Sequence, residues 1–439
     1  MNRSLSTLAF AALLAVAAGC GGLVDDDETR GPAPSGPAPG APSGGSSSGG
    51  APSAPSPSTP TPTPPPVGPY TGLVGTTDVS ILYPLPSAGA SRDFVRPDEV
   101  AAHGVLLPRA MVDQALGGRS LDVSVSDSRY DALRLVSLRL DPCSSRGAAP
   151  GACTSEIRLV FQALHDEAPG PGATGGLAAA DGAVHVMVDV PPDELVVVLQ
   201  EILTLKRASG DLALHELAPH PILAKEGLSG PFAKGLRQVI LGHLGGDRVA
   251  RVTFFDHNFG LDQDGWTFGV FDRAAGGGLV PGLVPTLGRE TEIVAGSSAH
   301  APLVGSSAEP YDSQKTKDAV AALVSSGRPA PGAPEVAALG PVLGAALRVQ
   351  DPRVHDASTT SCSNCHLAEG AVSIASGIYG MPATGGFSHA RSLARVDHRT
   401  SVTNLHAFGW LGREVSIMQR TANESVLVAD RMEKTLAPR

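Results

Sequence analysis

The amino-acid sequence predicts a multidomain chain, with an α+β domain of mixed strands and helices followed by a mostly α-helical domain at the C-terminus. The 439 residues leave room for two or three domains. In the middle of the chain, strand-like alternation and helical spacing of apolar residues are mixed, without regular strand–helix–strand repeats. A stretch rich in Pro and Gly at residues 327–334 breaks the pattern, so we place the domain boundary there, between residues 330 and 331.

Residues 1–19 have the pattern of a secretory signal peptide, because Arg3 precedes a short apolar run that ends in small residues. The run is too short to span a bilayer. It closes with the residues V-A-A-G-C, which resembles the lipobox of bacterial lipoproteins. The resemblance implies that Cys20 is acylated and anchors the chain to a membrane outside the cytoplasm, in the periplasm or at the outer membrane or cell surface. An ordinary signal peptide cleaved near Cys20 is the alternative.

Residues 20–70 are predicted to form a disordered tether that starts at the lipid anchor. From residue 31 to residue 69 the chain carries no charge and consists almost wholly of Pro, Gly, Ala, Ser and Thr. Such a segment cannot bury enough apolar surface to fold. We therefore expect it to hold the folded part of the chain away from the membrane.

Residues 71–330 are the predicted α+β domain. Alternating apolar residues predict strands at residues 79–83, 133–140, 156–161, 184–190, 249–255 and 266–271. Apolar residues at helical spacing predict helices at residues 108–116, from residue 192 onward and at residues 232–240. The domain contains no recognisable catalytic motif, such as a P-loop or HExxH. We therefore do not predict an enzyme.

Cys143 and Cys153 are predicted to form a disulfide bond. They enclose nine residues rich in Gly and Ala, and strand-like segments lie on both sides. A disulfide that closes a hairpin loop fits this arrangement, and disulfides belong outside the cytoplasm. Its role is expected to be structural, with a stabilisation on the order of 2 to 3 kcal/mol.

The sequence C-S-N-C-H at residues 362–366 has the spacing that attaches a c-type haem. Two thiols about one helical turn apart can both add to the vinyl groups of one porphyrin, and the adjacent imidazole can bind the iron. We therefore predict one covalent haem c, held by Cys362 and Cys365, with His366 as the proximal iron ligand. Half of a zinc site and a thioredoxin-like dithiol are the alternatives, but the chain has no second CxxC and the flanking residues read as loops.

Residues 331–439 resemble the class I c-type cytochromes in the order of their predicted elements. Apolar residues predict a helix at residues 335–349, before the CxxCH sequence, and a closing helix at residues 423–434 with Asn423 as its cap. The resemblance implies a mostly helical, cytochrome c-like domain around the haem.

The sequence leaves several candidates for the second axial ligand of the iron. Met418 lies 52 residues after His366 (418 minus 366), just before the predicted closing helix, where class I cytochromes supply a methionine. Met381 is followed by a proline, as in some small cytochromes, and ranks second; His389 ranks third. Methionine ligation would give a higher potential than two histidines. Three further histidines of this region are His355, His398 and His406.

Charge and composition narrow the function. A formal net charge of −10 and an aromatic content of 4% argue against binding to nucleic acid. The sequence instead predicts a membrane-anchored, exported c-type cytochrome that exchanges single electrons with a redox partner protein. The alternative is a surface binding or sensor lipoprotein, in which the haem is structural or binds a small ligand.

Overall fold

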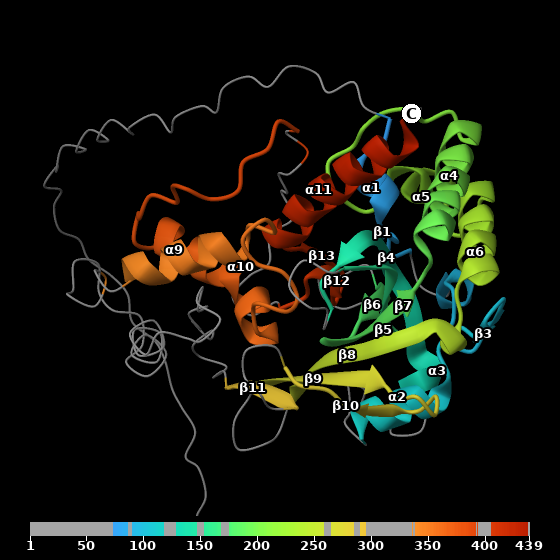
Figure 1. The fold of residues 1–439 in the computed structure, drawn as a ribbon, viewed down its shortest axis with the longest axis horizontal. Helices are drawn as coiled ribbons and strands as arrows, with labels where there is room; N and C mark the ends of the chain where they lie inside the picture. The colour runs from blue at the N-terminus through green and yellow to red at the C-terminus, as the bar shows by residue number, and fades with distance from the viewer. Residues whose placement is uncertain are drawn as a thin grey trace, which may run out of the picture. The chain divides into compact units, whose positions relative to one another are not determined.

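An antiparallel sheet organises the part of the chain that the computed structural model describes (Figure 1). Its nine strands are β1 (Ser80–Leu82), β4 (Leu133–Ser144), β5 (Thr154–Glu167), β6 (Gly176–Ala179), β7 (Gly182–Asp189), β8 (Val249–Asn258), β9 (Gly265–Arg273), β10 (Leu279–Pro281) and β11 (Thr291–Ala295). They pair in the order β1-β4-β5-β7-β8-β9-β10, and in addition β11 pairs with β9 and β6 with β5. The structure describes residues 73–86, 90–117, 129–146, 153–167, 175–258, 265–284, 290–295, 336, 339–391, 393 and 405–437.

Helices, 3₁₀ turns and two small hairpins complete the described elements. The helices are α1 (Thr76–Val79), α2 (Arg109–Leu116), α3 (Arg129–Ala132), α4 (Pro192–Ala208), α5 (Pro221–Glu226), α6 (Pro231–His243), α9 (Leu339–Val349), α10 (Cys362–Gly377) and α11 (Gln419–Leu436). The 3₁₀ turns are η1 (Ala90–Asp93) and η2 (Gly246–Arg248). The hairpins are β2 (Val100–Ala101) with β3 (Gly104–Val105), and β12 (Phe408–Leu411) with β13 (Glu414–Ile417). No helix in these described segments is both long enough and apolar enough to cross a membrane.

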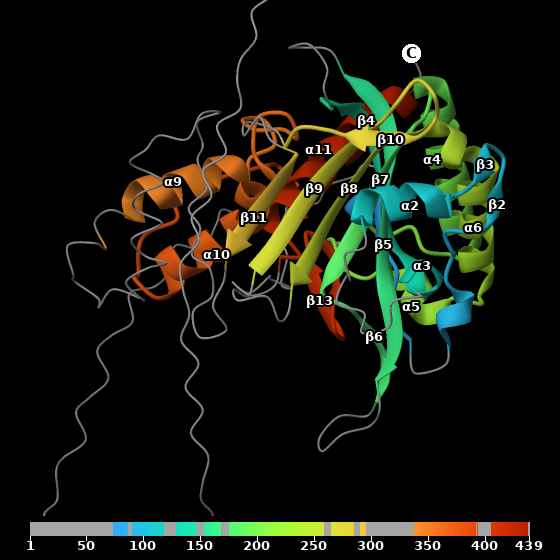
Figure 2. The ribbon, with the colours of Figure 1, turned by 90° about the horizontal axis from the view of Figure 1, so that it is seen from below.

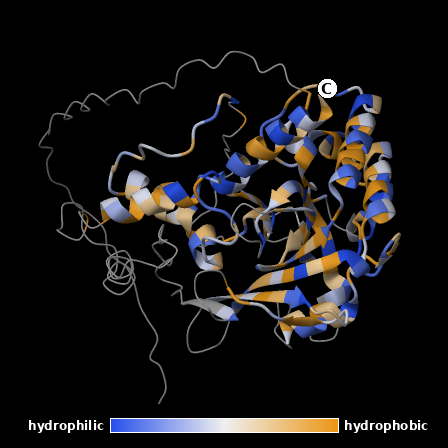
Figure 3. Cartoon of the chain, in the orientation of Figure 1, coloured by the Kyte–Doolittle hydropathy of each residue, from blue (hydrophilic) through white to orange (hydrophobic). Residues whose placement is uncertain are grey.

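One face of the sheet is apolar and is covered by α4 and α6, which lie side by side (Figures 1 and 2). Proline occupies the first turn of both helices, where it needs no hydrogen-bond donor. Hydrophobic and hydrophilic residues alternate along both (Figure 3), so that one side of each helix can be buried. Leu138 and Ile157 of the sheet lie with Val198 of α4 and Leu236 of α6 around one small apolar space. This layer is part of the main apolar core.

The other face of the sheet carries a row of mostly charged residues. The strand register places Arg139, Arg158, Met187, Arg251 and Asp272 side by side across β4, β5, β7, β8 and β9. Side chains alternate between the two faces of a strand, so this row points away from α4 and α6. Arg251 pairs with Asp272 and Arg158 with Glu156 within the sheet, but Arg139 pairs with Glu424 of the covering helix α11. The covering elements therefore have to supply polar groups as well.

The C-terminal part of the chain is fixed to this sheet by buried hydrogen bonds. The Gln162 side-chain amide accepts a hydrogen bond from the Trp410 backbone N–H (2.8 Å) and donates one to the Trp410 carbonyl (2.8 Å). The Ser137 hydroxyl donates to the Phe408 carbonyl at 2.8 Å, and the Trp410 indole donates to the Tyr83 carbonyl at 3.0 Å. These bonds hold the hairpin β12–β13 against β4 and β5.

The predicted fold class, a multidomain chain with a mostly α-helical cytochrome c-like domain at its end, is wrong. In the structure the closing residues form the hairpin β12–β13 and the helix α11, and their buried side chains belong to the same core as the sheet. The reason is that the sheet needs them, because they cover the face that α4 and α6 leave open. Of the elements predicted for this region, the helix before the CxxCH sequence and the closing helix are present, as α9 and α11. Residues 1–19, the tether at 20–70 with Cys20, and the boundary at 330 and 331 lie outside the described residues.

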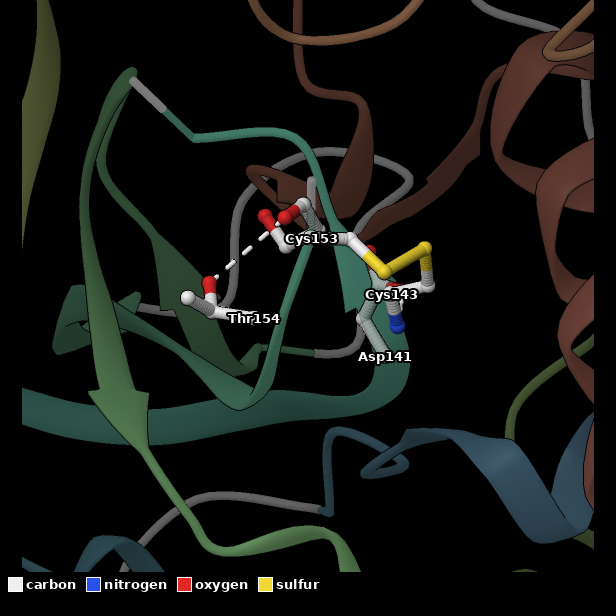
Figure 4. Close-up of a disulfide and its surroundings, with 5 residues drawn as sticks. Asp141, Cys143, Cys153 and Thr154 are labelled. Atoms are coloured by element: carbon white, nitrogen blue, oxygen red, sulfur yellow. Dashed lines mark hydrogen bonds between the residues drawn. A yellow bond between two sulfur atoms is a disulfide. The ribbon is translucent and has the colours of Figure 1, made fainter. Parts of the chain in front are cut away.

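Two local predictions in this region have different outcomes. The disulfide bond between Cys143 and Cys153 is present, beside the connection between β4 and β5 (Figure 4), where Thr154 donates to the Ser144 carbonyl at 3.5 Å. The prediction that Asn423 caps the closing helix is wrong, because α11 begins at Gln419. Asn423 is buried inside the helix and donates its amide to the Gln350 carbonyl at 2.8 Å.

Substitution Gly409→Ala should destabilise the fold by about 1 to 3 kcal/mol. A Cβ atom at this position would lie 2.5 Å from Oε1 of Gln162, which is fully buried and holds Trp410. Moving the amide aside would leave buried polar groups unpaired. The free energy of unfolding, measured by chemical denaturation, tests this. Gly377→Ala at the exposed end of α10 is the control, because nothing lies within 4 Å of its Cβ position. Equal stability of both variants would contradict this account.

His220 should make the fold less stable as the pH falls. It is 1% exposed and its ring lies on Phe232 at 4.6 Å. Burial, and then the nearby Lys206, lower the pKa of His220 to about 3. Below about pH 6.5 the unfolded chain therefore binds a proton that the folded chain rejects, so stability is complete above that pH and decreases below it.

The contribution of His220 should amount to about 2 kcal/mol between pH 7 and pH 5. Denaturation curves at the two pH values, for the wild type and for His220→Leu, measure it. The wild type should lose more stability than the variant, since other buried histidines contribute equally to both. The same loss in both proteins would show that His220 is protonated in the folded state.

Candidate functional site

A cavity lies between the charged face of the sheet and the N-terminal ends of α10 and α11. Its empty volume is about 930 Å³, counting the mouth that opens to solvent. The floor comes from β4, β5, β7, β8 and β9, and the opposite wall from the two helices and the loop before α10. The lining residues that matter below are Arg139, Arg146, Glu156, Arg158, His185, Arg251, Cys362, Cys365, His366, Met418, Arg420 and Glu424.

The CxxCH residues form the first turns of α10. Ser361 is the N-cap, and its hydroxyl accepts a hydrogen bond from the Asn364 backbone N–H at 3.3 Å. The thiols of Cys362 and Cys365 are half-buried and both line the cavity, about one helical turn apart. The expectation of loops on both sides is wrong on the C-terminal side, because the helix continues to Gly377. The two thiols therefore have the spacing and the common exposure that two bonds to one cofactor edge need.

His366 is oriented by a backbone hydrogen bond. Its Nδ1 bonds to the Leu405 carbonyl, in the segment that leads into β12. Because the carbonyl can only accept, Nδ1 carries the proton and Nε2 keeps its lone pair, as in most metal-binding histidines. The ring centroid lies 5.4 Å from that of Phe255 and 5.1 Å from that of Phe268. Burial lowers the pKa of His366 to about 4, so the ring is neutral and able to bind a metal at pH 7.

Arginine side chains make the lining of the cavity positive. Five arginines and two glutamates line it. Arg139 pairs with Glu424 at 2.8 Å, and Arg158 pairs with the fully buried Glu156 at 3.1 Å. Arg420 instead donates to two backbone carbonyls, one of them that of His355 at 2.8 Å. The groups that Arg420 bonds to are therefore neutral carbonyls and not carboxylates.

Glu424 stays ionised in this setting. Burial alone would raise the pKa of Glu424, but Arg139, Arg420 and Arg158 outweigh burial and lower it to about 2. A cavity with fixed, oriented guanidinium groups suits a ligand that carries carboxylates, because arginine binds carboxylates in a planar, two-point geometry.

The predicted second ligands of the iron lie in three different places. Met418 lines the cavity, and its side chain is buried at the start of α11. Met381 packs instead in the apolar contact between α9 and α10. Nε2 of His389 lies 2.9 Å from a carboxylate oxygen of Asp430 in α11. Of these candidates, only Met418 is therefore brought together with His366.

Two of the further histidines, His355 and His406, do not line the cavity. His406 is buried with its ring centroid 4.7 Å from that of Phe255, and His355 is buried near the Thr359 hydroxyl at 3.3 Å. Neither is among the residues that line the cavity. His398 lies outside the described residues.

Sequence analysis missed His185, which lines the cavity from β7. Its ring centroid lies 6.3 Å from that of His366, with 27° between the ring planes. The only sequence signal is its place in the run V-H-V-M-V-D-V, where it alternates with residues that face the apolar core. That pattern fixes which face His185 occupies, but not that His366, 181 positions away (366 minus 185), lies opposite.

Comparison with known proteins identifies no relative. No family model matches the chain, and neither a curated protein nor a solved structure is detectably similar to it.

Replacing Ser361 by Ala should cost about 1 kcal/mol of stability and loosen the turn that carries both thiols, because the N-cap hydrogen bond is lost. Thermal or chemical unfolding measures the change. Ser376→Ala in the same helix is the matched control, since that hydroxyl only donates to the Val372 carbonyl one turn earlier. The control should stay within about 0.5 kcal/mol of the wild type. A larger loss in the control than in Ser361→Ala would contradict the capping role.

Proposed function

We propose that this protein is an exported, membrane-anchored c-type cytochrome that transfers single electrons through one covalent haem. The observation that carries the proposal is the arrangement of Cys362, Cys365 and His366 on one wall of a single cavity. The hydrogen bond from His366 Nδ1 to the Leu405 carbonyl supports it, because this bond leaves Nε2 for an iron atom.

The residues around the cavity fit a haem. Cys362 and Cys365 would hold the porphyrin through two thioether bonds, and His366 would bind the iron. The lining is positive, and one of its arginines, Arg420, is bonded to backbone carbonyls. Such a lining suits the two propionate groups of a haem. When bound, the haem supplies an iron that changes its charge by one electron. The chain itself would hold it, keep His366 neutral and limit its contact with water.

The alternative roles of the two cysteines fit less well. A zinc site made by the protein needs about four ligands, and the described residues contain no group of three or more His, Cys, Asp or Glu side chains placed to bind a metal ion. A dithiol oxidoreductase needs a thiol with a low pKa, whereas burial raises the pKa of Cys365. The CxxCH sequence with its oriented histidine is better suited to haem.

Export is part of the proposal. The Cys143–Cys153 disulfide supports it, because disulfides and haem attachment both belong outside the cytoplasm. We assign the lipid anchor to Cys20 and the tether to residues 20–70. The tether would let the folded part meet a redox partner protein in the cell envelope.

Haem staining of a denaturing gel tests the proposal. The full chain is expressed in a host with cytochrome c maturation, as the wild type and as Cys362→Ser/Cys365→Ser. The wild type should stain and the variant should lose the stain completely, because the haem would no longer be covalently attached. Cys143→Ser/Cys153→Ser removes two other cysteines and should keep the stain. A wild-type band without stain would overturn the proposal.

A further inference from the structure

We infer that His185 is the second axial ligand of the haem iron, opposite His366. This inference rests on the proposed function. It assigns a role to the β-sheet, which the sequence left without one, and it replaces Met418 as the ligand.

The two imidazole rings have a separation that fits one metal ion between them. Metal–imidazole bonds of about 2 Å on each side of an ion place the two ring centroids roughly 6 Å apart. The centroids of His185 and His366 lie 6.3 Å apart. Both side chains line the same cavity, His185 from its floor and His366 from the opposite wall.

His185 has no polar partner that would compete for its nitrogen atoms. Among the described residues no hydrogen bond or ion pair involves its ring, whose neighbours are the rings of Phe255 and His366. The ring is half-buried and lines the cavity, so its nitrogen atoms are open to a ligand there. Burial, together with His366 and Arg158, lowers the pKa of His185 well below 6.5, so the ring is neutral, the form that ligates metals.

The backbone keeps His185 in place. It lies in the centre of the sheet, paired with Val160 of β5 on one side and with Thr253 of β8 on the other. Met418 occupies a different kind of position, because it is the residue before α11 and its side chain is almost fully buried. It can fill the wall of the cavity without contacting the iron. Sites built on strands hold their ligands more precisely than sites on loops.

Two histidines would saturate the iron and lower its potential relative to histidine and methionine. The site would then carry electrons and would not bind small molecules at the iron. This choice separates the proposed electron carrier from a sensor, which needs an open iron position.

The test uses the full, haem-loaded chain and the spin state of its iron, measured by optical and electron paramagnetic resonance spectroscopy. The wild type should be six-coordinate and low-spin. His185→Gly should lose the low-spin signal, and added imidazole should restore it by entering the vacated position. His185→Met should stay low-spin, with a higher reduction potential. A side chain that only supports packing would produce neither the rescue nor the rise in potential.

Two control variants make the outcome specific. His165→Gly removes an exposed histidine from β5 of the same sheet and should change nothing. Met418→Leu should also leave the low-spin signal unchanged. The inference is overturned if Met418→Leu abolishes that signal while His185→Gly keeps it, or if the wild type itself is five-coordinate. Each of these results requires covalent haem, so they leave the proposed function intact. An unstained wild-type band would instead refute the proposed function.

Discussion

The charged row across one face of the sheet is the constraint on which the rest of the structure depends. Arg139, Arg158, Arg251 and Asp272 lie side by side with Met187 on neighbouring strands, so that face cannot be sealed by an apolar helix. The apolar face receives α4 and α6, whereas the charged face receives helix ends, which carry polar groups themselves. The space left between them is the cavity.

The same C-terminal segment completes the core and forms the wall of the site. Gln162 binds both backbone groups of Trp410, and the carbonyl of Leu405, just before that hairpin, orients His366. Stability and site geometry are therefore coupled, because a shift of the hairpin on the sheet would also move the acceptor of the His366 hydrogen bond. A haem held this way would contact a β-sheet on one side and helix N-termini on the other.

Local sequence patterns predicted the elements whose residues repeat with a clear period. The strands at β1, β4, β5, β7, β8 and β9 and the helices α2, α4 and α6 lie where alternation or helical spacing placed them. The short strands β6 and β10 to β13 were missed. Three to five residues give too little periodicity, and whether such a segment forms a strand depends on the neighbouring strand it pairs with. The prediction that the last hundred residues form a mostly helical domain failed for a related reason, since the hairpin before α11 exists only against the sheet.

The sequence by itself determined the chemistry of the site: two thiols at haem-binding spacing, an adjacent imidazole, and a disulfide between Cys143 and Cys153. These features depend on residues that are close together in the sequence, so they can be recognised from the sequence directly. The tertiary structure alone decided what faces that motif, because His185 and Arg158 come from strands about two hundred positions upstream. Pairing of distant strands brings such residues together, and one sequence carries no local signal for which strand will lie beneath a given helix.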